Sequence, residues 1–314
     1  MDRTLRTAGV DIGGTKVASA VLDGHQLRDV AQEPTVTDDP RALVDQIVRI
    51  VGALGPVDAV GIGVPSVVRL SDGMVLSSVN IAAFRDVRLR DELTERLGVP
   101  VHVDNDANVA AVSSVWDHQL ALQHRSLACL TVGTGVGSGI ALDGRPLRGS
   151  RTSAVELGHL IVSADLTDGA PVGRPADAHG AHPDSLEHWA SGRALDRLAT
   201  ERGFADGLAV TEAGLAGDPN AIEILRILGE RLGVGIAAVI TLLEPEAVVI
   251  AGGVSAAGEL LVGPAREAAR RLLLPGLGVD TEIRVADHGP YAGVRGAALI
   301  ARLEEHRPPT RAPA

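Results

Sequence analysis

A stretch near the start of the chain reads Thr7-Ala8-Gly9-Val10-Asp11-Ile12-Gly13-Gly14-Thr15-Lys16, and a second stretch reads Leu127-Ala128-Cys129-Leu130-Thr131-Val132-Gly133-Thr134-Gly135-Val136. The second copy lies 120 residues after the first throughout (131 − 11), without a gap. In both copies the chain continues through another apolar run to an Asp-Gly pair, at residues 23–24 and 143–144. Two apolar runs joined by a Gly/Thr-rich turn and followed by Asp-Gly are typical of consecutive antiparallel strands. The repetition predicts a chain made of two similar halves.

Each copy places a turn of phosphate-binding composition between its two strands. Glycine lets backbone amides approach an anion closely, and threonine adds a hydroxyl donor. The residues expected to bind the phosphates of a nucleotide are Gly13, Gly14, Thr15 and Lys16 in the first turn and Gly133, Thr134 and Gly135 in the second. Two such turns, one from each half, can hold the phosphates of one nucleotide from opposite sides. The pattern therefore indicates phosphoryl transfer.

Charged side chains flank the first turn. Asp11 ends the first predicted strand, where a carboxylate can hold Mg²⁺ through water while the turn binds phosphate. The alternative is an aspartate that only caps the hairpin. Lys16 is the single lysine of the chain. A codon bias of the source would explain why lysine is so rare, but this lysine stands where a cation helps to bind phosphate.

The composition limits the classes of protein and partner. The chain has 314 residues, 45% of them hydrophobic and 22% charged, which predicts a globular protein with room for two medium domains. A net charge of −11 without a basic run argues against nucleic acid or an anionic membrane as the main partner. The single cysteine, Cys129, lies in an apolar strand pattern and is expected to be a core residue. The sequence allows no intrachain disulfide, contains no apolar run of bilayer length, and leaves no room for a signal peptide before residue 11. These three features predict a cytoplasmic protein.

The order of apolar patterns predicts an α/β chain of two domains. Strands are expected at 57–64 and 100–104, and a further buried strand, followed by a Gly252-Gly253 turn, is expected at 246–255. Helices are expected near 40–54, 86–98, 192–201, 219–243 and 258–273. An exposed loop is expected at 163–184. The expected division is an N-terminal domain at 1–112 joined by the helix at 290–306, a C-terminal domain at 113–289, and a flexible tail at 307–314.

Three further groups of side chains suit catalysis on a polyol. Asp106 follows a predicted strand and opens a helix, so it can be a helix cap, a base toward an attacking hydroxyl, or both. Asn105 beside it offers an amide that suits neighbouring sugar hydroxyls. Glu156 and His159, three residues apart, and Glu187 can bind hydroxyl groups as well, although a solvated glutamate and a satisfied core histidine explain them equally well.

Taken together these segments resemble the ROK family of bacterial sugar kinases and repressors, in particular its glucokinase branch. The resemblance covers nearly the whole chain and rests on Asp11-Ile12-Gly13-Gly14-Thr15-Lys16, Gly61-Ile62-Gly63-Val64-Pro65, Asn80, Asn105-Asp106-Ala107-Asn108, Gly133-Thr134-Gly135-Val136-Gly137, Glu156-Leu157-Gly158-His159, Leu186-Glu187, Ala190-Ser191-Gly192-Arg193 and Ala251-Gly252-Gly253-Val254. Any one of these segments is weak alone, but the set is specific.

The resemblance implies the actin-like, ribonuclease-H-like ATPase fold, with two duplicated α/β domains around a cleft. It implies ATP and Mg²⁺ as cofactors, Asp106 as the catalytic base toward a sugar hydroxyl, typically the 6-OH, and Gly252 and Gly253 near the adenosine. The implied sugar contacts are Ser66, Asn80, Asn105, Asp106, Glu156, His159 and Glu187. Relatives form homodimers or homotetramers, and some use polyphosphate in place of ATP.

This chain departs from the family pattern in two places. The stretch 170–185 lacks the three cysteines that, with the histidine at the position of His159, hold a structural zinc in relatives, so no thiolate zinc site is expected. A metal held by histidines of that loop, such as His182, is a less favoured possibility. Near the pocket, Ser66 and Val155 replace family glycines and Arg69 replaces an aspartate. These changes favour a substrate other than plain glucose, such as an amino-hexose, an N-acetylhexosamine or a cyclitol.

Two alternatives to a sugar kinase stay open. A catalytically weak sugar sensor would also keep the sugar contacts, although the ten residues before Asp11 are too few for the helix-turn-helix domain of a repressor. An ATPase of the same fold acting on another partner would not need the Asn105-Asp106 and Glu156-x-x-His159 pairs.

Overall fold

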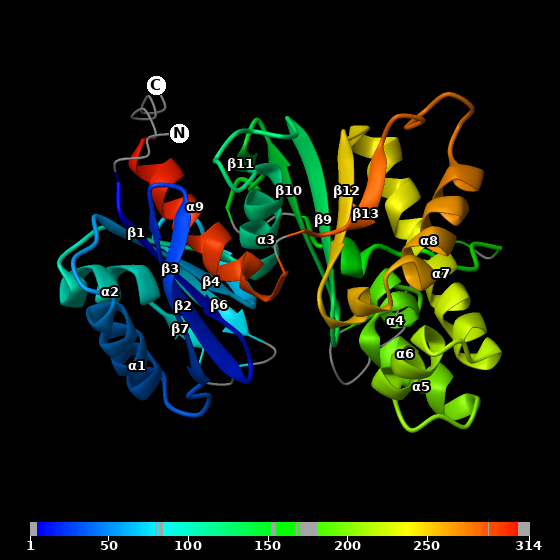
Figure 1. The fold of residues 1–314 in the computed structure, drawn as a ribbon, viewed down its shortest axis with the longest axis horizontal. Helices are drawn as coiled ribbons and strands as arrows, with labels where there is room; N and C mark the ends of the chain where they lie inside the picture. The colour runs from blue at the N-terminus through cyan, green and yellow to red at the C-terminus, as the bar shows by residue number, and fades with distance from the viewer. Residues whose placement is uncertain are drawn as a thin grey trace. The chain divides into compact units, whose positions relative to one another are not determined.

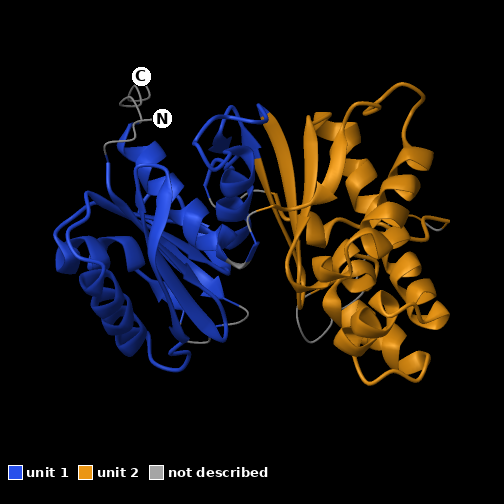
Figure 2. Ribbon diagram, viewed as in Figure 1, with its two compact units in different colours: residues 1–125, 141–154, 288–314 blue, residues 126–140, 155–287 orange. Residues whose placement is uncertain are grey.

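The computed structural model describes residues 5–78, 81, 84–151, 155–167, 169, 181–287 and 289–306. The chain divides into two compact units (Figure 2). Unit 1 comprises residues 1–125, 141–154 and 288–314, and unit 2 comprises residues 126–140 and 155–287. The domain limits expected from the sequence, at 112/113 and 289/290, stay a prediction, because compactness alone does not test which segments fold as a domain.

Unit 1 is built on a five-stranded sheet in the order β3-β2-β1-β4-β8 (Figure 1). Its strands are β1 (Thr7–Ile12), β2 (Lys16–Asp23), β3 (Gln26–Pro34), β4 (Ala59–Val64) and β8 (Val101–Asn105), and its helices are α1 (Pro40–Ala53), α2 (Leu89–Leu97), α3 (Asp106–Val115) and α9 (Ala292–Glu305). β1 pairs with β2 antiparallel and with β4 parallel, and β4 pairs with β8 parallel. The predicted strand–turn–strand unit and the predicted helix at 40–54 are confirmed.

The alternation of side chains along β1 divides them between the two faces of the sheet. Ala8, Val10 and Ile12 belong to the core that contains the buried side chains of α1. Thr7 faces α9 instead, because its hydroxyl donates to the carbonyl of Ala298 at 3.0 Å. Asp11 is on the same face as Thr7, which places the end of β1 beside the start of α9.

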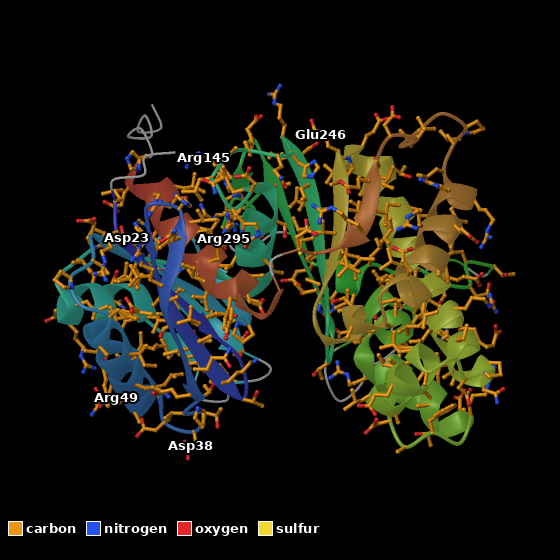
Figure 3. All side chains as sticks on the ribbon, in the orientation of Figure 1. Asp23, Asp38, Arg49, Arg145, Glu246 and Arg295 are labelled. Carbon is orange, nitrogen blue, oxygen red and sulfur yellow. The ribbon has the colours of Figure 1, made fainter. Side chains whose placement is uncertain are left out.

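Buried arginines join α9 to its surroundings in unit 1. Arg295, labelled in Figure 3, donates to the carbonyl of Ser113 at 2.7 Å and also to the carbonyl of Asp117, at the end of α3. Burial lowers the pKa of Arg295 to about 10. Arg302 is fully buried and donates to the carbonyls of Leu5, Leu22 and Gly24. These bonds satisfy charges that would be costly to bury alone.

A small antiparallel sheet, β5-β6-β7, follows the end of β4. Its strands are β5 (Ser66–Arg69), β6 (Met74–Ser78) and β7 (Arg85–Val87). The sequence predicted a helix over 86–98, but Val87 pairs with Val75 of β6 and the helix begins only at Leu89. Apolar side chains at helical spacing begin at Leu89, so nothing before that residue would bury a helix face.

Unit 2 carries most of a second five-stranded sheet, in the order β11-β10-β9-β12-β13. Its strands are β9 (Ser126–Val132), β10 (Val136–Leu142), β11 (Arg145–Pro146), β12 (Ala247–Ala251) and β13 (Glu282–Val285). The helices of unit 2 are α4 (Leu186–Ala190), α5 (Gly192–Glu201), α6 (Gly207–Leu215), α7 (Pro219–Leu243) and α8 (Glu259–Leu272), with the short 3-10 turns η1 (Leu157–His159) and η2 (Gly253–Ala257). A third 3-10 turn, η3 (Gly289–Tyr291), precedes α9 in unit 1. The predicted helices at 192–201, 219–243 and 258–273 are confirmed.

The two sheets repeat one another in strand order and in register. β1 and β9 occupy the central position, and each pairs parallel with a strand that begins with alanine. Thr7 pairs with Ala59 in the first sheet, and Leu127, its counterpart 120 residues later, pairs with Ala247 in the second. The internal repeat seen in the sequence is therefore a repeat of structure.

The longest described helix is α7, and it is too polar for a membrane span. Within the described part of the chain, no helix is both long enough and apolar enough to cross a bilayer.

Candidate active site

Asp11 lies against the first turn of α9. A Cβ atom on Gly293 would be 2.1 Å from Oδ2 of Asp11, so only glycine leaves room for this carboxylate. Gly9, two residues earlier on the same face, is equally close to α9, since a Cβ there would be 2.0 Å from the carbonyl oxygen of Val294. Close packing of β1 on α9 thus brings the carboxylate to a helix N-terminus, where the helix dipole favours negative charge.

Desolvation dominates the titration of Asp11. Burial raises the pKa of its carboxyl to about 6, against the opposing attraction of Lys16. Among the described residues no hydrogen bond to this carboxylate is found. A desolvated carboxylate without donors is suited to a cation, so the position fits the Mg²⁺ ligand expected from the sequence.

The first phosphate turn is closed by backbone bonds that leave its tip in solvent. The amide of Gly13 donates to the carbonyl of Lys16 at 2.9 Å, and Thr35 holds both sides of the turn through the carbonyls of Gly13 and Thr15. Thr15 and Lys16 are exposed, and Gly14 is partly exposed. The turn is therefore fixed in shape and accessible to an anion.

The second turn has a similar closure and an additional support. The amide of Gly133 donates to the carbonyl of Gly135 at 3.0 Å, and the amide of Gly192, the first residue of α5, donates to the carbonyl of Gly133 at 2.7 Å. Thr134 is exposed at the tip. A Cβ atom on Gly192 would be 2.6 Å from that carbonyl, so Gly192 supports the turn, a role that the sequence did not assign.

The predicted adenosine turn packs against the same strand end. Gly252 has a φ of 89°, and a Cβ atom there would be 2.4 Å from the carbonyl oxygen of Val132. Gly253 has open space where a Cβ would project. The end of β12 and the second phosphate turn are thus neighbours in unit 2.

Asp106 is placed by a network at the end of β8. The helix cap is Asn105, whose Oδ1 accepts from the amide of Ala107 at 2.9 Å, and Asp106 is the first residue of α3. Asp104 is fully buried, and its Oδ1 accepts from the amide of Asn105 at 2.8 Å and from Nδ2 of Asn108 at 2.9 Å. The network fixes the backbone on which Asp106 stands, and Asp106 remains partly exposed.

Ser66 lies beside Asn105 and has an unused hydroxyl. Nδ2 of Asn105 donates to the carbonyl of Ser66 at 3.3 Å. The side chain of Ser66 is only 6% exposed, and its Oγ has no hydrogen-bond partner among the described residues. Buried hydroxyl groups are normally bonded, so this one is available to a ligand. Asn80, the remaining contact predicted in this unit, lies outside the described residues.

The three predicted sugar contacts of unit 2 gather around Val136. Oε2 of Glu187 accepts from the amide of Val136 at 2.9 Å, and Oε1 pairs with Arg193 at 2.7 Å. Gly158, between Glu156 and His159, approaches the carbonyl of Val136, since a Cβ there would be 2.2 Å from that oxygen.

Electrostatics link these three side chains. Desolvation raises the pKa of Glu156, with an opposing contribution from His159 and a further increase from Glu187. In this conformation the carboxylate of Glu187 covers the second phosphate turn, because a Cβ on Gly135 would be 2.3 Å from Oε2. Glu187 therefore contacts a predicted phosphate turn as well as the predicted sugar residues.

Val155 holds Glu156 in a strained backbone. Its φ is 75°, a conformation that β-branched residues rarely adopt. The hydroxyl of Ser138 donates to the carbonyl of Val155 at 2.6 Å and accepts from the amide of Leu157 at 2.9 Å, which keeps the segment in place. The glycine expected here from the family pattern would adopt this φ without strain.

No group of three or more metal-ligating side chains occurs within the described residues. Most of the stretch 170–185, where relatives carry the zinc cysteines, lies outside them. The expectation of no structural zinc site therefore stays a prediction.

Two sheets of the same order and register, each with a glycine-rich turn after its central strand, define an actin-like ATPase fold. Comparison with solved structures agrees. The ROK family glucokinase from Streptomyces griseus, in complex with glucose and AMPPNP, has a TM-score of 0.79 at 33% identity, covering 95% of this chain and 99% of that one. The ROK hexokinase from Thermus thermophilus has a TM-score of 0.81 at 34% identity, covering 96% and 99%.

The chain belongs to the ROK family, whose model matches residues 7–304. A glucokinase of Streptomyces coelicolor is 34% identical over 94% of this chain and 97% of its own length. An N-acetyl-D-glucosamine kinase of Photobacterium profundum is also 34% identical, over 93% and 98%. The fold and family expected from the sequence are confirmed.

Proposed function

We propose that this chain transfers the γ-phosphoryl group of ATP to a hydroxyl of a hexose-type sugar, in the manner of a glucokinase, with the 6-OH as acceptor. The enzyme class expected from the sequence, a sugar kinase, is confirmed by full-length relatives of that class. The observation that carries the residue assignment is the fixed position of Asp106 beside the Asn105 cap and the unused hydroxyl of Ser66.

Asp106 is the general base in this proposal. Its carboxylate accepts the proton of the sugar hydroxyl as the sugar oxygen bonds to the γ-phosphorus and the bond to the β-phosphate oxygen breaks, releasing ADP. Asn105 holds neighbouring hydroxyls of the sugar. The buried carboxylate of Asp104 supports this geometry by fixing the backbone of Asn105, so that little reorganisation is needed in the transition state.

Each glycine-rich turn is a proposed phosphate site of its own unit. In unit 1 Lys16 and the amides of the first turn would interact with phosphate, and in unit 2 the second turn would do so, with Gly252 and Gly253 proposed to contact the adenosine. Asp11 would hold Mg²⁺, which offsets phosphate charge when it is bound. Glu187 must give up the amide of Val136 if that amide is to bind phosphate, so nucleotide binding and the sugar contact of Glu187 are linked.

The substrate is a hexose whose recognition includes Ser66. A buried hydroxyl without a partner favours a sugar that presents a polar group at that position. The replacement of family glycines by Ser66 and Val155 favoured a substrate other than glucose, but glucokinases among the relatives make glucose the first candidate. An N-acetylhexosamine or amino-hexose is the second, because an N-acetyl-D-glucosamine kinase is equally similar. Cytoplasmic location, a homodimer or homotetramer, and ATP rather than polyphosphate as donor belong to the same proposal.

The test is a coupled assay of ADP release with ATP and Mg²⁺ over a panel of glucose, mannose, glucosamine, N-acetylglucosamine, N-acetylmannosamine and inositol. At least one sugar is expected to raise ADP release far above the rate with ATP alone. The variant Ser66→Gly tests the role of the Ser66 hydroxyl, and it should change the order of preference among the sugars. ADP release that no sugar stimulates would contradict the proposal.

A further inference from the structure

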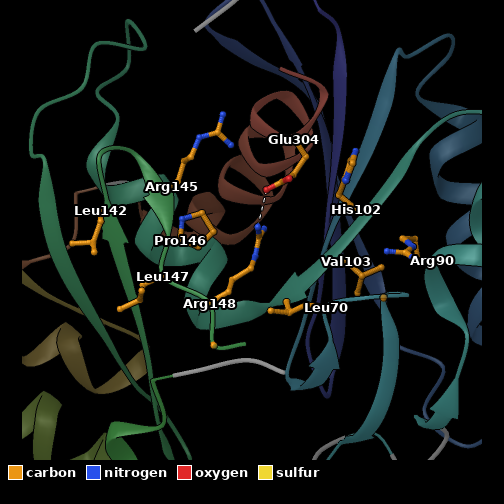
Figure 4. Close-up of a pocket in the computed structure, with 12 residues that line it drawn as sticks. Leu70, Arg90, His102, Val103, Leu142, Arg145, Pro146, Leu147, Arg148 and Glu304 are labelled. Carbon is orange, nitrogen blue, oxygen red and sulfur yellow. Dashed lines mark hydrogen bonds and ion pairs between the residues drawn. The ribbon is translucent and has the colours of Figure 1, made fainter. Parts of the chain in front are cut away.

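A positively charged pocket lies wholly within unit 1, where residues of β8, β11 and α9 line it. Its volume is about 580 Å³, which is the size of a site for a small metabolite. Figure 4 shows Arg90, Arg145 and Arg148 around it, with His102 and Glu304. Three arginines and a single lining carboxylate stand out in a chain of net charge −11, and a recessed cluster of one sign concentrates its field on a ligand.

The arginines differ in how fully their charges are used. Arg148 is engaged on both sides, with Nε 2.7 Å from Oδ2 of Asp104 and Nη1 2.7 Å from Oε1 of Glu304. Arg90 donates to the carbonyl of Ser71 at 3.0 Å, and its Nε lies 3.5 Å from Oδ1 of Asp91, so its charge is partly used. The backbone of Arg145 pairs with Leu142 of β10, but its guanidinium has no hydrogen bond or ion pair among the described residues. Its guanidinium is therefore free to bind an anion.

The position of Arg90 is built into the backbone. Gly73 has a φ of 64°, and a Cβ atom there would be 2.5 Å from Cβ of Arg90. A side chain at residue 73 would push Arg90 away from the pocket wall. Leu70, Val103 and Leu147 also line the pocket, and these apolar side chains can contact the carbon skeleton of a ligand.

We propose that this pocket binds a phosphate monoester of a small metabolite and that the bound ester slows the kinase. Guanidinium groups recognise phosphate through paired N–H donors, and the apolar lining distinguishes an ester from inorganic phosphate. The dianion is held by Arg90 and Arg145 and competes with Asp104 and Glu304 for Arg148.

Arg148 connects the pocket to the proposed base. Asp104 is fully buried, and its Oδ2 is paired with Arg148 while its Oδ1 fixes the amide of Asn105. Drawing Arg148 toward a ligand leaves a buried carboxylate without its cation, which is costly. The backbone at Asn105 and Asp106 then loses its support, so the ester lowers kcat and added ATP or sugar does not reverse the loss.

The binding test uses calorimetric titration of the full chain with glucose 6-phosphate and, separately, inorganic phosphate, each with and without a non-hydrolysable ATP analogue. Wild-type protein is expected to bind the ester saturably in the presence of the analogue. Arg145→Gln should weaken this binding at least tenfold. Arg125→Gln, an exposed arginine of the same unit whose side chain is 76% exposed, is the control and should bind as the wild type does.

The second arm measures turnover at saturating substrates with increasing ester. Inhibition that disappears in Arg145→Gln, with basal kcat unchanged, supports the proposal. Inorganic phosphate that binds as tightly as the ester would overturn the proposed preference for an ester, because the apolar lining would then contribute nothing to recognition. An Arg145→Gln titration identical to the wild type, or complete displacement of the ester by the ATP analogue, would overturn it. The binding arm does not depend on the proposed activity, so the two can fail separately.

Discussion

Replacing Asp11 by asparagine is expected to stabilise the free protein while abolishing its activity. Burial raises the pKa of the Asp11 carboxyl from 3.8 to about 6. At 1.36 kcal/mol per pKa unit, holding this carboxylate ionised costs up to about 3 kcal/mol at neutral pH, since the shift is roughly two units. Asparagine keeps the shape beside Gly293 and removes the charge, so it removes most of this cost.

The sign of the pH dependence distinguishes this explanation from a general packing effect. A carboxyl with a raised folded pKa contributes stability that is full below the unfolded pKa, near 4, and is lost as the pH rises through about 6. The advantage of Asp11→Asn over the wild type is therefore largest above pH 7, shrinks between pH 6 and pH 4, and vanishes below that range. Urea unfolding of both proteins at pH 5, 6, 7 and 8 measures it.

The activity of the same variant completes the test. Asp11→Asn cannot hold Mg²⁺ as a carboxylate does, so kcat/KM should fall by two orders of magnitude or more, while wild-type kcat/KM declines as the pH is lowered through about 6. A variant that is less stable than the wild type at pH 8 would show that burial of the ionised carboxylate is not costly, and one that keeps wild-type activity would show that Asp11 is not needed for turnover.

Other substitutions test separate parts of the account. Gly293→Ala places a methyl group against the Asp11 carboxylate and should lower kcat/KM at least tenfold with little change in sugar affinity; unchanged kinetics would contradict that contact. Arg302→Met leaves the buried carbonyl of Leu22 and the partly buried carbonyls of Leu5 and Gly24 without this donor, and urea unfolding should show a loss of about 3 kcal/mol, whereas a loss below about 1 kcal/mol would mean that other donors replace it. Val155→Gly relieves the strained φ and should raise the midpoint of thermal unfolding while increasing KM for the sugar, because Glu156 is held less firmly; a lower midpoint would show that the valine is not strained.

The repeated strand–turn–strand segment made the fold predictable from sequence. An apolar alternation and a Gly/Thr turn are local features, and the offset of 120 residues exposed the duplication directly. The small sheet β5-β6-β7 was not predicted, because its strands are short and β7 consists of the charged pair Arg85-Asp86 followed by Val87. The strand propensity of these three residues is a weak guide, because pairing with β6 determines their conformation.

The candidate site was predicted in its residue types but not in its contacts. Sequence spacing suggested Asp106 as a cap, whereas the structure gives that role to Asn105. The bond from the amide of Val136 to Glu187 joins residues 51 positions apart, and no local pattern encodes it. The need for glycine at residue 293 depends on packing against β1, although a glycine inside a helix is itself a signal of close approach.

Asp106 is proposed to remove the proton from the sugar hydroxyl, and the variant Asp106→Asn removes the carboxylate that would accept this proton. Sugar affinity is measured by calorimetric titration, and turnover is measured by coupled ADP release on the same preparation. We expect kcat to fall by at least three orders of magnitude while the sugar Kd stays within a few-fold of the wild type. A variant that retains near wild-type kcat would show that Asp106 is not the base.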